Sequence, residues 1–398
     1  MPSKSLTFDI VKECSTSKAR AGLLTLPHGC VETPVFMPVV LQATLKGITS
    51  QQLERLGCRL MLNNTYHLGL RPGQSVLDMI GGAHLFQGWP HNLLTDSGGF
   101  QMVSLLKLSR ITEKGVEFHS PHDGSLMLLT PEYSISLQNS IGSDIIMQLD
   151  DVVHSLTPLK RVEEAMWRSI RWLDRCIIAN KYPEKQSLYA IIQGGLSEEL
   201  RRICCLEMMK RETPGIAIGG LSGGEEKSQT CKIVSICTDL LPSNKPRYLM
   251  GVGYTEDLIV NVALGIDQFD CVYPTRTARF GNALTPRGVL NLRNKCFAND
   301  YNPIDENCQC PCCKPDEWGI TRAYIHHIVC KETVAAHLLT IHNIYYQLNL
   351  MKEIRNAIIY DQFPAFVKKA FNLYFGKKEN YPKWAVDSLN SVNINLLE

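Results

Sequence analysis

The sequence has no long hydrophobic run and almost no excess of charge. No apolar stretch approaches the roughly 18 uninterrupted residues of a membrane span, and the first residues, MPSKSLTFDIVKEC, lack the apolar core of a secretory signal. Lys and Arg number 41 and Asp and Glu 39, a formal net charge of +2, which excludes a polyelectrolyte tail or a wholly basic nucleic-acid arm. Low-complexity segments and repeats of fixed period are also absent. We therefore expect a soluble intracellular protein.

What remains is an ordinary globular composition with many cysteines. Hydrophobic residues make up 44% and charged residues 20% of the chain, which permits a sizeable core. Its 398 residues correspond to two or three average domains, although an α/β barrel alone commonly uses well over 200. The 15 cysteines are odd in number and unevenly spaced, in a chain too long to need disulfides. They indicate a reducing compartment and leave room for a metal site.

Six short apolar segments between about residues 90 and 275 end abruptly at polar or glycine clusters. They are HNLLTDSGGFQ, SDIIMQLDD, SLYAIIQGG, GIAIGGLSGGE, RYLMGVG and IDQFDCVYPTR. Each is typical of a buried parallel strand followed by a loop with polar groups. Helical patterns lie between them, with Ser197 and Thr255 as candidate N-caps. This alternation favours an α/β fold of the (β/α)8 TIM barrel type over a doubly wound sheet, so the loops should converge on one face.

A cysteine cluster follows the last of these segments. Cys308, Cys310 and Cys313 form a C-x-C-x-x-C set, with Cys312 adjacent. Four histidines follow in a helical region: His326, His327, His337 and His342. Three thiolates and one imidazole satisfy tetrahedral Zn²⁺, and a site with four protein ligands is structural. The alternative is a set of reduced surface cysteines, and the spacing does not decide which histidine completes a site.

The chain is thereby divided into three expected parts. Residues 1–285 form the barrel with its catalytic face. Residues 286–350 form a zinc-binding subdomain that is inserted into or appended to the barrel, and residues 351–398 form a C-terminal helical segment that completes it. The division rests on a change in the sequence pattern after residue 285, where alternating strand and helix patterns give way to a basic, cysteine-rich loop.

Aspartates stand at three of the expected strand ends: Asp96, Asp150 with Asp151, and Asp270. A lone aspartate is usually a cap or a loop hydrogen bond, but here three ends deliver carboxylates to one face, together with Gln193. Such carboxylates suit glycosyl chemistry, in which one attacks an oxocarbenium-like carbon and another handles protons. A hydrolase, a transglycosylase or a carboxylate-metal lyase would fit. GGLSGGE lacks the G-K-S/T ending of a P-loop, so its glycines are interpreted as admitting a planar ligand.

A basic run without any acid covers residues 271–299. Its cations are Arg276, Arg279, Arg287, Arg293 and Lys295. A solvated face is the usual explanation of such a run. Because this one begins directly after Asp270, beside the expected active face, it also suits a polyanionic substrate such as nucleic acid.

These residues resemble the tRNA-guanine transglycosylase family over about residues 8–350. The motifs that carry the resemblance are LNNTYHLGLRPG (62–73), TDSGGFQ (95–101), LDD (149–151), IQGG (192–195), AIGGLSGGE (217–225), YLMGVG (248–253), FDCVYPTRTARFG (269–281) and the cysteine set with a later HN pair. The resemblance implies that Asp270 is the nucleophile that attacks the ribose C1′ of the wobble guanosine, leaving a covalent enzyme–tRNA intermediate. It also implies that Asp96 is the general acid/base.

The resemblance further implies the binding residues. Those for the leaving and entering bases, guanine and queuine, are Asp150, Gln193, Gly219, Gly220, Leu221, Phe100 and Met250. Arg276 and Arg279 would hold the tRNA anticodon loop. One structural zinc ion per chain would be bound by Cys308, Cys310, Cys313 and His342.

Departures from the bacterial pattern indicate a eukaryotic type of catalytic subunit. Val152 and Val153 follow the LDD motif, and Ser222 and Gly223 replace an Ala-Val pair, which enlarges the pocket for queuine. Such members imply a cytoplasmic heterodimer with a non-catalytic paralogue, peripheral association with the mitochondrial outer membrane, and tRNAs with GUN anticodons, those for aspartate, asparagine, histidine and tyrosine. The alternative is that this chain is the non-catalytic tRNA-binding or scaffold subunit, against which the retention of Asp96 and Asp270 argues. A barrel glycoside hydrolase would leave the basic run and the cysteines unexplained.

Overall fold

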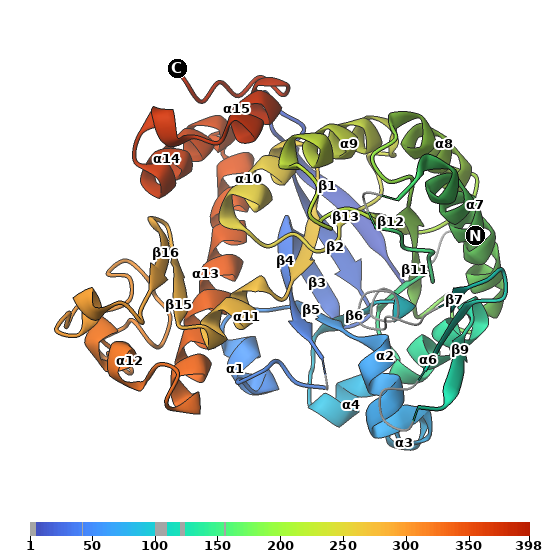
Figure 1. Ribbon diagram of the computed structural model, residues 1–398, viewed down its shortest axis with the longest axis horizontal. Helices are drawn as coiled ribbons and strands as arrows, with labels where there is room; N and C mark the ends of the chain where they lie inside the picture. Colours follow the sequence, from blue (N-terminus) through green and yellow to red (C-terminus); the bar gives the residue numbers. More distant parts are fainter. Residues whose placement is uncertain (1–4, 42, 100–109, 120–123, 155–156) are drawn as a thin grey trace.

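The computed structural model describes residues 5–41, 43–99, 110–119, 124–154 and 157–398, and its centre is a closed barrel of parallel strands (Figure 1). The barrel strands are β4 (Val35–Val40), β5 (Leu60–Asn63), β6 (Asn92–Thr95), β10 (Ile145–Met147), β11 (Ser187–Ile192), β12 (Gly215–Ile218), β13 (Arg247–Leu249) and β14 (Gln268–Cys271). Pairing of β14 with β4 closes the ring. The predicted TIM barrel is confirmed, and the six predicted strands are β6 and β10 to β14.

The first two barrel strands were not predicted. Pro38 lies inside β4, and a proline within an apolar run argues against an interior strand. β5 is only four residues long and leads into the LNNTYH motif without a glycine or proline to mark its end. Barrel closure, and not local pattern, therefore makes these two segments strands.

Helices surround the barrel and cover the outer faces of its strands. They are α1 (Ser50–Arg55), α2 (Thr65–Leu68), η1 (Gly69–Gly73), α3 (Gln74–Ile80), α4 (Ala83–Gln87), α6 (Pro131–Ile141), α7 (Leu159–Ala179), α8 (Glu198–Met209), α9 (Lys227–Leu240) and α10 (Thr255–Ala263). Ser197 caps α8 as predicted, because its side chain accepts a hydrogen bond from Leu200 N. The expectation for Thr255 was wrong: Thr255 is the first residue of α10, Tyr254 occupies the N-cap position without a side-chain hydrogen bond, and the Thr255 hydroxyl is hydrogen-bonded to the Tyr346 hydroxyl.

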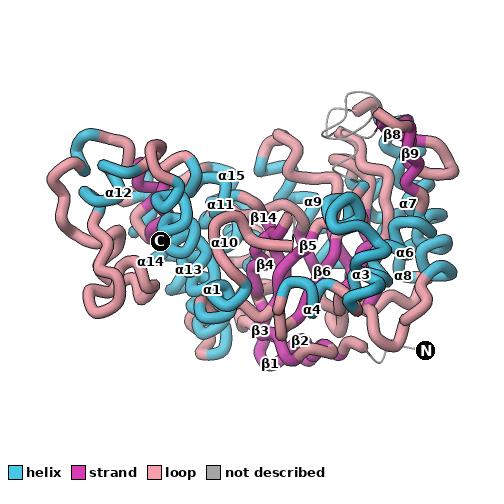
Figure 2. Tube along the Cα trace, turned by 90° about the horizontal axis from the view of Figure 1, so that it is seen from below, coloured by secondary structure: helices cyan, strands magenta, loops and turns pink. Residues whose placement is uncertain are grey.

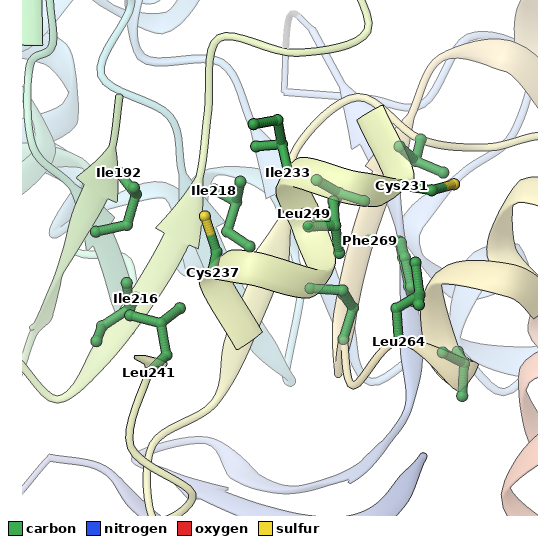
Figure 3. Packing of buried hydrophobic residues seen from close by; sticks show 14 of the residues in the cluster. Ile192, Ile216, Ile218, Cys231, Ile233, Cys237, Leu241, Leu249, Leu264 and Phe269 are labelled. Atoms are coloured by element: carbon green, nitrogen blue, oxygen red, sulfur yellow. The ribbon is translucent and has the colours of Figure 1, made fainter. Parts of the chain in front are cut away.

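Each barrel strand is buried on both faces. On β12, Ile216 and Ile218 point toward α9 and pack in one apolar cluster with Cys237 (Figure 3). Ala217, between them, belongs to the cluster inside the barrel, where Tyr248 also lies. Successive side chains of a strand point to opposite faces, so a strand enclosed by helices outside and a filled barrel inside is mainly apolar on both faces. This explains why apolar residues dominate the strands in the sequence, although polar residues such as Asn92 and Gln268 also belong to them.

An unpredicted antiparallel sheet closes the lower end of the barrel (Figure 2). Its strands are β1 (Thr7–Glu13), β2 (Arg20–Leu26) and β3 (Gly29–Thr33). Leu24 and Val31 from this sheet share a core with Leu60 and Ile145, the first residues of β5 and β10. The sheet therefore seals the end at which the barrel strands begin, and the opposite end carries the loops after the strands. A second small sheet consists of β7 (Arg110–Ile111), β8 (Val116–His119) and β9 (Leu126–Leu129).

The chain after β14 builds a unit beside the barrel and then returns to it. Its elements are α11 (Tyr273–Arg279), β15 (Asn282–Thr285), β16 (Gly288–Asn291), η2 (Lys295–Phe297), α12 (Arg322–Ile328), α13 (Thr333–Ile359), α14 (Phe363–Phe375), η3 (Lys378–Asn380) and α15 (Lys383–Asn390). In Figure 1 α13 runs between the barrel and the group of β15, β16 and α12. Leu339 of α13 packs in the cysteine-containing cluster and Ile358 in the outer core of the barrel.

One helix thus serves both units. The expected boundary at residue 350 falls within α13, so the division into separate domains stays a prediction. Within the described residues, no helix combines the length and the apolar character that a membrane crossing requires.

Candidate active site and metal centre

Asp270 is the third of the four residues of β14 and lies near the open end of the barrel. Its Oδ1 accepts hydrogen bonds from the Tyr248 hydroxyl at 2.6 Å and from Gly251 N at 2.8 Å. Both donors come from the neighbouring β13 and the turn after it. Burial raises the pKa of Asp270, and the two donors act in the opposite direction. Among the described residues, no donor occupies Oδ2 of Asp270, so this oxygen is available to a substrate.

Asp96 follows β6 at the same end of the barrel. Its Oδ2 accepts a hydrogen bond from Asn64 Nδ2 at 2.7 Å, and its Oδ1 accepts one from Thr65 N at 2.9 Å. These donors follow β5, so barrel pairing of β5 and β6 sets the orientation of the carboxylate. The pKa of Tyr248 lies well above its ordinary value because of burial and the charge of Asp270, with a further contribution from Asp96. The two acids that the sequence singled out therefore lie near one hydroxyl.

A cluster of buried polar groups follows β10, β11 and β12. Gln193 Nε2 donates to Asp150 Oδ2 at 2.6 Å. Burial raises the pKa of Asp150 to about 7, the hydrogen bond from Gln193 lowers it, and the neighbouring charge of Asp151 raises it. A Cβ atom on Gly220 would lie 2.2 Å from Gln193 Oε1, and one on Gly219 would lie 2.6 Å from a methyl group of β11. Only glycine fits at these two positions, because any side chain there would collide with Gln193 or β11.

Of the remaining predicted base-binding residues, Met250 lies next to this polar cluster. Met250 Sδ is 3.6 Å from the position that a Cβ of Gly219 would take, so Met250 lies beside the glycine pair. Leu221 is half-buried and packs against the outer core of the barrel. Phe100 lies outside the described residues. The loop continues through Ser222, which has a left-handed backbone with φ of 64°.

The second acid of the LDD motif has a different position. Asp151 is fully buried and forms ion pairs with Arg161, at 2.7 Å, and with Arg168, both on α7. Its backbone N–H donates to the Ser169 hydroxyl at 2.9 Å. Asp151 therefore anchors the strand end to the helix layer, and only Asp150 of the pair contacts Gln193.

The basic run begins on α11, directly after the nucleophile candidate. Arg276 and Arg279 are exposed, as are the three later cations, Arg287, Arg293 and Lys295. Asn343 of α13 holds this region in place: its Nδ2 donates to Pro274 O and Asn282 O, both at 3.0 Å. The exposed guanidinium groups are thus attached to a fixed helix next to the site.

Three cysteines and one histidine form a compact ligand set. His342 Nδ1 lies 3.7 Å from Cys308 Sγ, 3.5 Å from Cys310 Sγ and 3.4 Å from Cys313 Sγ, and all four atoms are within 4.8 Å of one another. Tetrahedral zinc bonds place nitrogen and sulfur ligands about 3.6 Å apart. The other ring nitrogen, Nε2, lies 2.8 Å from the Leu284 carbonyl, which fixes the tautomer that leaves Nδ1 free for a metal. These residues therefore fit a metal ion.

The structure also distinguishes the four candidate metal ligands from the other histidines and cysteines near them in the sequence. His326 and His327 face the carbonyl groups of Leu292 and Ala298, so His342 completes the set. Cys312 points away, and its thiol donates to Leu338 O at 3.2 Å. All fifteen cysteines are free of disulfides, and the pair on α8, Cys204 and Cys205, is buried in the core.

Sequence reasoning missed the residues that orient the two carboxylates. Tyr248 and Asn64 lie inside the YLMGVG and LNNTYH motifs, yet no role was predicted for either side chain. Glu225, whose carboxylate accepts from Gly223 N at 2.8 Å and supports the glycine loop, was likewise passed over. The partners of Tyr248 and Asn64 come from other strands or their ends, whereas Glu225 bonds the backbone of its own loop. For all three, the only signal in the sequence was their presence in the motifs.

Comparison with known proteins shows the family to which the chain belongs. A family model described as queuine tRNA-ribosyltransferase matches residues 14–376. The queuine tRNA-ribosyltransferase catalytic subunit of Schizosaccharomyces pombe is 67% identical over 99% of this chain and 98% of its own length. The protein of the same name from Caenorhabditis elegans is 50% identical over 95% and 97%, and a Thermoanaerobacter queuine tRNA-ribosyltransferase is 46% identical over 95% and 100%. The chain therefore belongs to the queuine tRNA-ribosyltransferase family of pentosyltransferases.

Proposed function

We propose that this chain exchanges the wobble guanine of tRNAs with GUN anticodons for queuine by two successive displacements at the ribose C1′. Its substrates would be the tRNAs for aspartate, asparagine, histidine and tyrosine. The observation that carries the proposal is Asp270, a carboxylate with one oxygen held by Tyr248 and Gly251 and the other directed to no described donor. Such a carboxylate is oriented for attack at carbon.

In the first displacement, Asp270 Oδ2 bonds to C1′ while the bond from C1′ to guanine N9 breaks. Guanine leaves with the bonding electrons and a proton from Asp96. In the second, Asp96 takes the ring N–H proton of queuine, the queuine nitrogen bonds to C1′, and Asp270 departs with its electrons. Two displacements retain the configuration at C1′. One glycosidic bond replaces another, so the reaction needs no redox partner.

The pocket beside the acids suits the edge of a purine-like base. Asp150 would accept hydrogen bonds from ring and exocyclic N–H groups, while Gln193 and the backbone at Gly219, Gly220 and Leu221 would bind the carbonyl side. Met250 and Phe100 would stack on the two ring faces. The adjacent Ser222-Gly223 pair lacks the branched side chain of the bacterial Ala-Val pair, which leaves space for the cyclopentenediol of queuine.

The exposed arginines would bind the anticodon loop. Arg276 and Arg279 stand on the helix that follows the nucleophile, where they can contact phosphates on both sides of an extruded base. A wobble base is unpaired, so moving it into the pocket costs less than flipping a base out of a duplex.

We also propose that the ion held by Cys308, Cys310, Cys313 and His342 is a single structural zinc. Four protein ligands leave no open coordination position, so the ion would connect the cysteine loop to α13 and take no part in bond exchange. The resemblance to eukaryotic family members supports a heterodimer with a non-catalytic paralogue, cytoplasmic location and peripheral contact with the mitochondrial outer membrane. The mass of the species that carries activity tests the heterodimer.

The exchange is tested with tRNA that carries labelled guanine at the wobble position. Purified protein, together with its paralogous subunit, should release the label when queuine is added, in proportion to the queuine incorporated. Absence of release would refute the proposal, and release without incorporation would indicate a hydrolase.

Replacing Tyr248 with Phe should move the acid limb of the pH profile of kcat to higher pH. The hydroxyl lowers the pKa of Asp270 by donating to it, and the reaction needs the ionised carboxylate. Without that donor the pKa rises, so activity is lost at a higher pH as the solution is acidified. At pH values above the acid limb, where kcat no longer changes with pH, we expect kcat of Y248F to be about 2- to 10-fold lower than that of wild type. An unshifted acid limb in Y248F would contradict the assigned contact.

Wild-type protein should show a KM for guanine that rises as the pH falls through about 7, the pKa of Asp150. Protonation removes one of the oxygen acceptors that the N–H groups of the base require. Asp150→Asn should raise this KM by about 100-fold, because a buried amide donor then faces ring donors, and it should abolish the pH dependence. The measurement is KM between about pH 5.5 and 8 at saturating tRNA. If the KM of Asp150→Asn still rose with falling pH as in wild type, a group other than Asp150 would be responsible for the pH dependence.

A further inference from the structure

A second group of metal-binding side chains lies at the closed floor of the barrel. His28 is on the turn between β2 and β3, His84 is on α4, and Asp144 immediately precedes β10. His28 Nδ1 lies 2.6 Å from Asp144 Oδ1, and His84 Nε2 lies 3.3 Å from Asp144 Oδ2. One ligand atom from each residue falls within 4.8 Å of the others. The group therefore joins three separate segments around a single carboxylate.

The two imidazole rings are stacked and directed at the same carboxylate. Their centroids are 3.7 Å apart with an interplanar angle of 17°, so protonating both rings would place two positive charges in contact. The Nε2 atom of His84 is buried and makes no hydrogen bond of acceptable geometry within the described part of the chain. A divalent cation would bind both nitrogens and the carboxylate at once, which a single shared proton does not.

The backbone around the group is already fixed. Asp144 Oδ2 accepts a hydrogen bond from Leu93 N at 2.8 Å, and His28 N donates to Asn92 Oδ1 at 3.1 Å. Such outer contacts orient metal ligands. Asp144 is almost fully buried, whereas 40% of the His28 side chain is exposed, so water can complete the coordination from that side.

We propose that His28, His84 and Asp144 form a second site for a divalent transition-metal ion of the zinc type. Two imidazoles and one carboxylate are a donor set that such ions take in proteins. Because Asp144 and Leu93 stand at the starts of β10 and β6, the site lies at the opposite end of the barrel from Asp270. The ion would fasten the N-terminal sheet to the barrel floor and would not enter the reaction.

The test is the number of metal ions per chain after equilibrium dialysis against micromolar free Zn²⁺, together with the melting temperature. Wild type should bind one equivalent more than H84A or H28A, and Zn²⁺ should raise the melting temperature of wild type by more than that of either variant. The matched control is His91→Ala, since His91 pairs with Glu54 at 3.0 Å, and among the described residues no second imidazole contacts that carboxylate. H91A should retain the additional equivalent. Counting by difference makes the result independent of the cysteine site and of the proposed exchange activity.

Equal metal content in wild type, H28A and H84A would overturn the proposal, as would loss of the same equivalent in H91A. If H84A does not fold, the metal content of H28A alone tests the proposal, because the half-exposed ring of His28 can be removed with less disturbance of the core. Guanine exchange should be the same in wild type and H28A, which verifies that the variant is folded.

Discussion

Asp270→Asn is expected to reduce the rate of guanine exchange by at least about 10⁴-fold, the scale seen when a covalent nucleophile is removed. The amide oxygen can still accept from Tyr248 and Gly251, which hold the wild-type side chain, so the geometry of the site should survive. What is lost is the negatively charged oxygen that bonds to C1′. The measurement is release of labelled guanine from the wobble position, with denaturing electrophoresis to detect the covalent adduct.

Two observations show whether the variant reports on chemistry alone. D270N should bind tRNA with about wild-type affinity, because the exposed Arg276 and Arg279 are unchanged, and should form no adduct. Asp96→Asn should instead slow proton transfer while leaving the nucleophile in place, so an adduct can still form. Release of label by D270N at the wild-type rate would refute the assignment of the nucleophile.

Cys310→Ser is expected to release the metal ion and to lower the free energy of unfolding by about 3–5 kcal/mol, because metal binding and folding are coupled in such sites. Cys310 is fully buried, and a serine hydroxyl replaces a thiolate poorly as a zinc ligand. Elemental analysis and thermal unfolding are the measurements. A folded C310S protein with a full equivalent of metal at this site, or wild type without metal, would contradict the prediction.

Cys312→Ser is the matched control. Cys312 is also buried and only two positions away, but its thiol bonds the Leu338 carbonyl. C312S should keep the ion.

Loss of the ion should also weaken the binding of tRNA more than the binding of the base, because His342 and Asn343 of α13 hold β15 and α11. We therefore expect the KM for tRNA to rise more than the KM for guanine in C310S.

Most of the barrel was predictable because its signals are local. A strand covered on both faces must be mainly apolar, and the loop after it must change to polar or glycine residues, so β6 and β10 to β14 are visible in the sequence. Strands with a weaker local signal were not predicted. Pro38 interrupts the apolar run of β4, and the segments of the antiparallel sheet β1 to β3 lack a clear strand pattern in the sequence. Their place depends on pairings with distant segments, β14 with β4 above all.

The sequence by itself identified the candidate residues for the chemistry: acids at strand ends, glycines near Gln193 and three spaced cysteines. These features follow from neighbours along the chain. Residue spacing left open which acid of the LDD motif contacts Gln193 and which histidine joins the cysteines, although the resemblance implied Asp150 and His342. The tertiary structure shows that Asp150 contacts Gln193, that His342 joins the cysteine set, and that His28 and His84 meet at Asp144. Each depends on distances between segments far apart in sequence, which the closure of the barrel and the packing of α13 set.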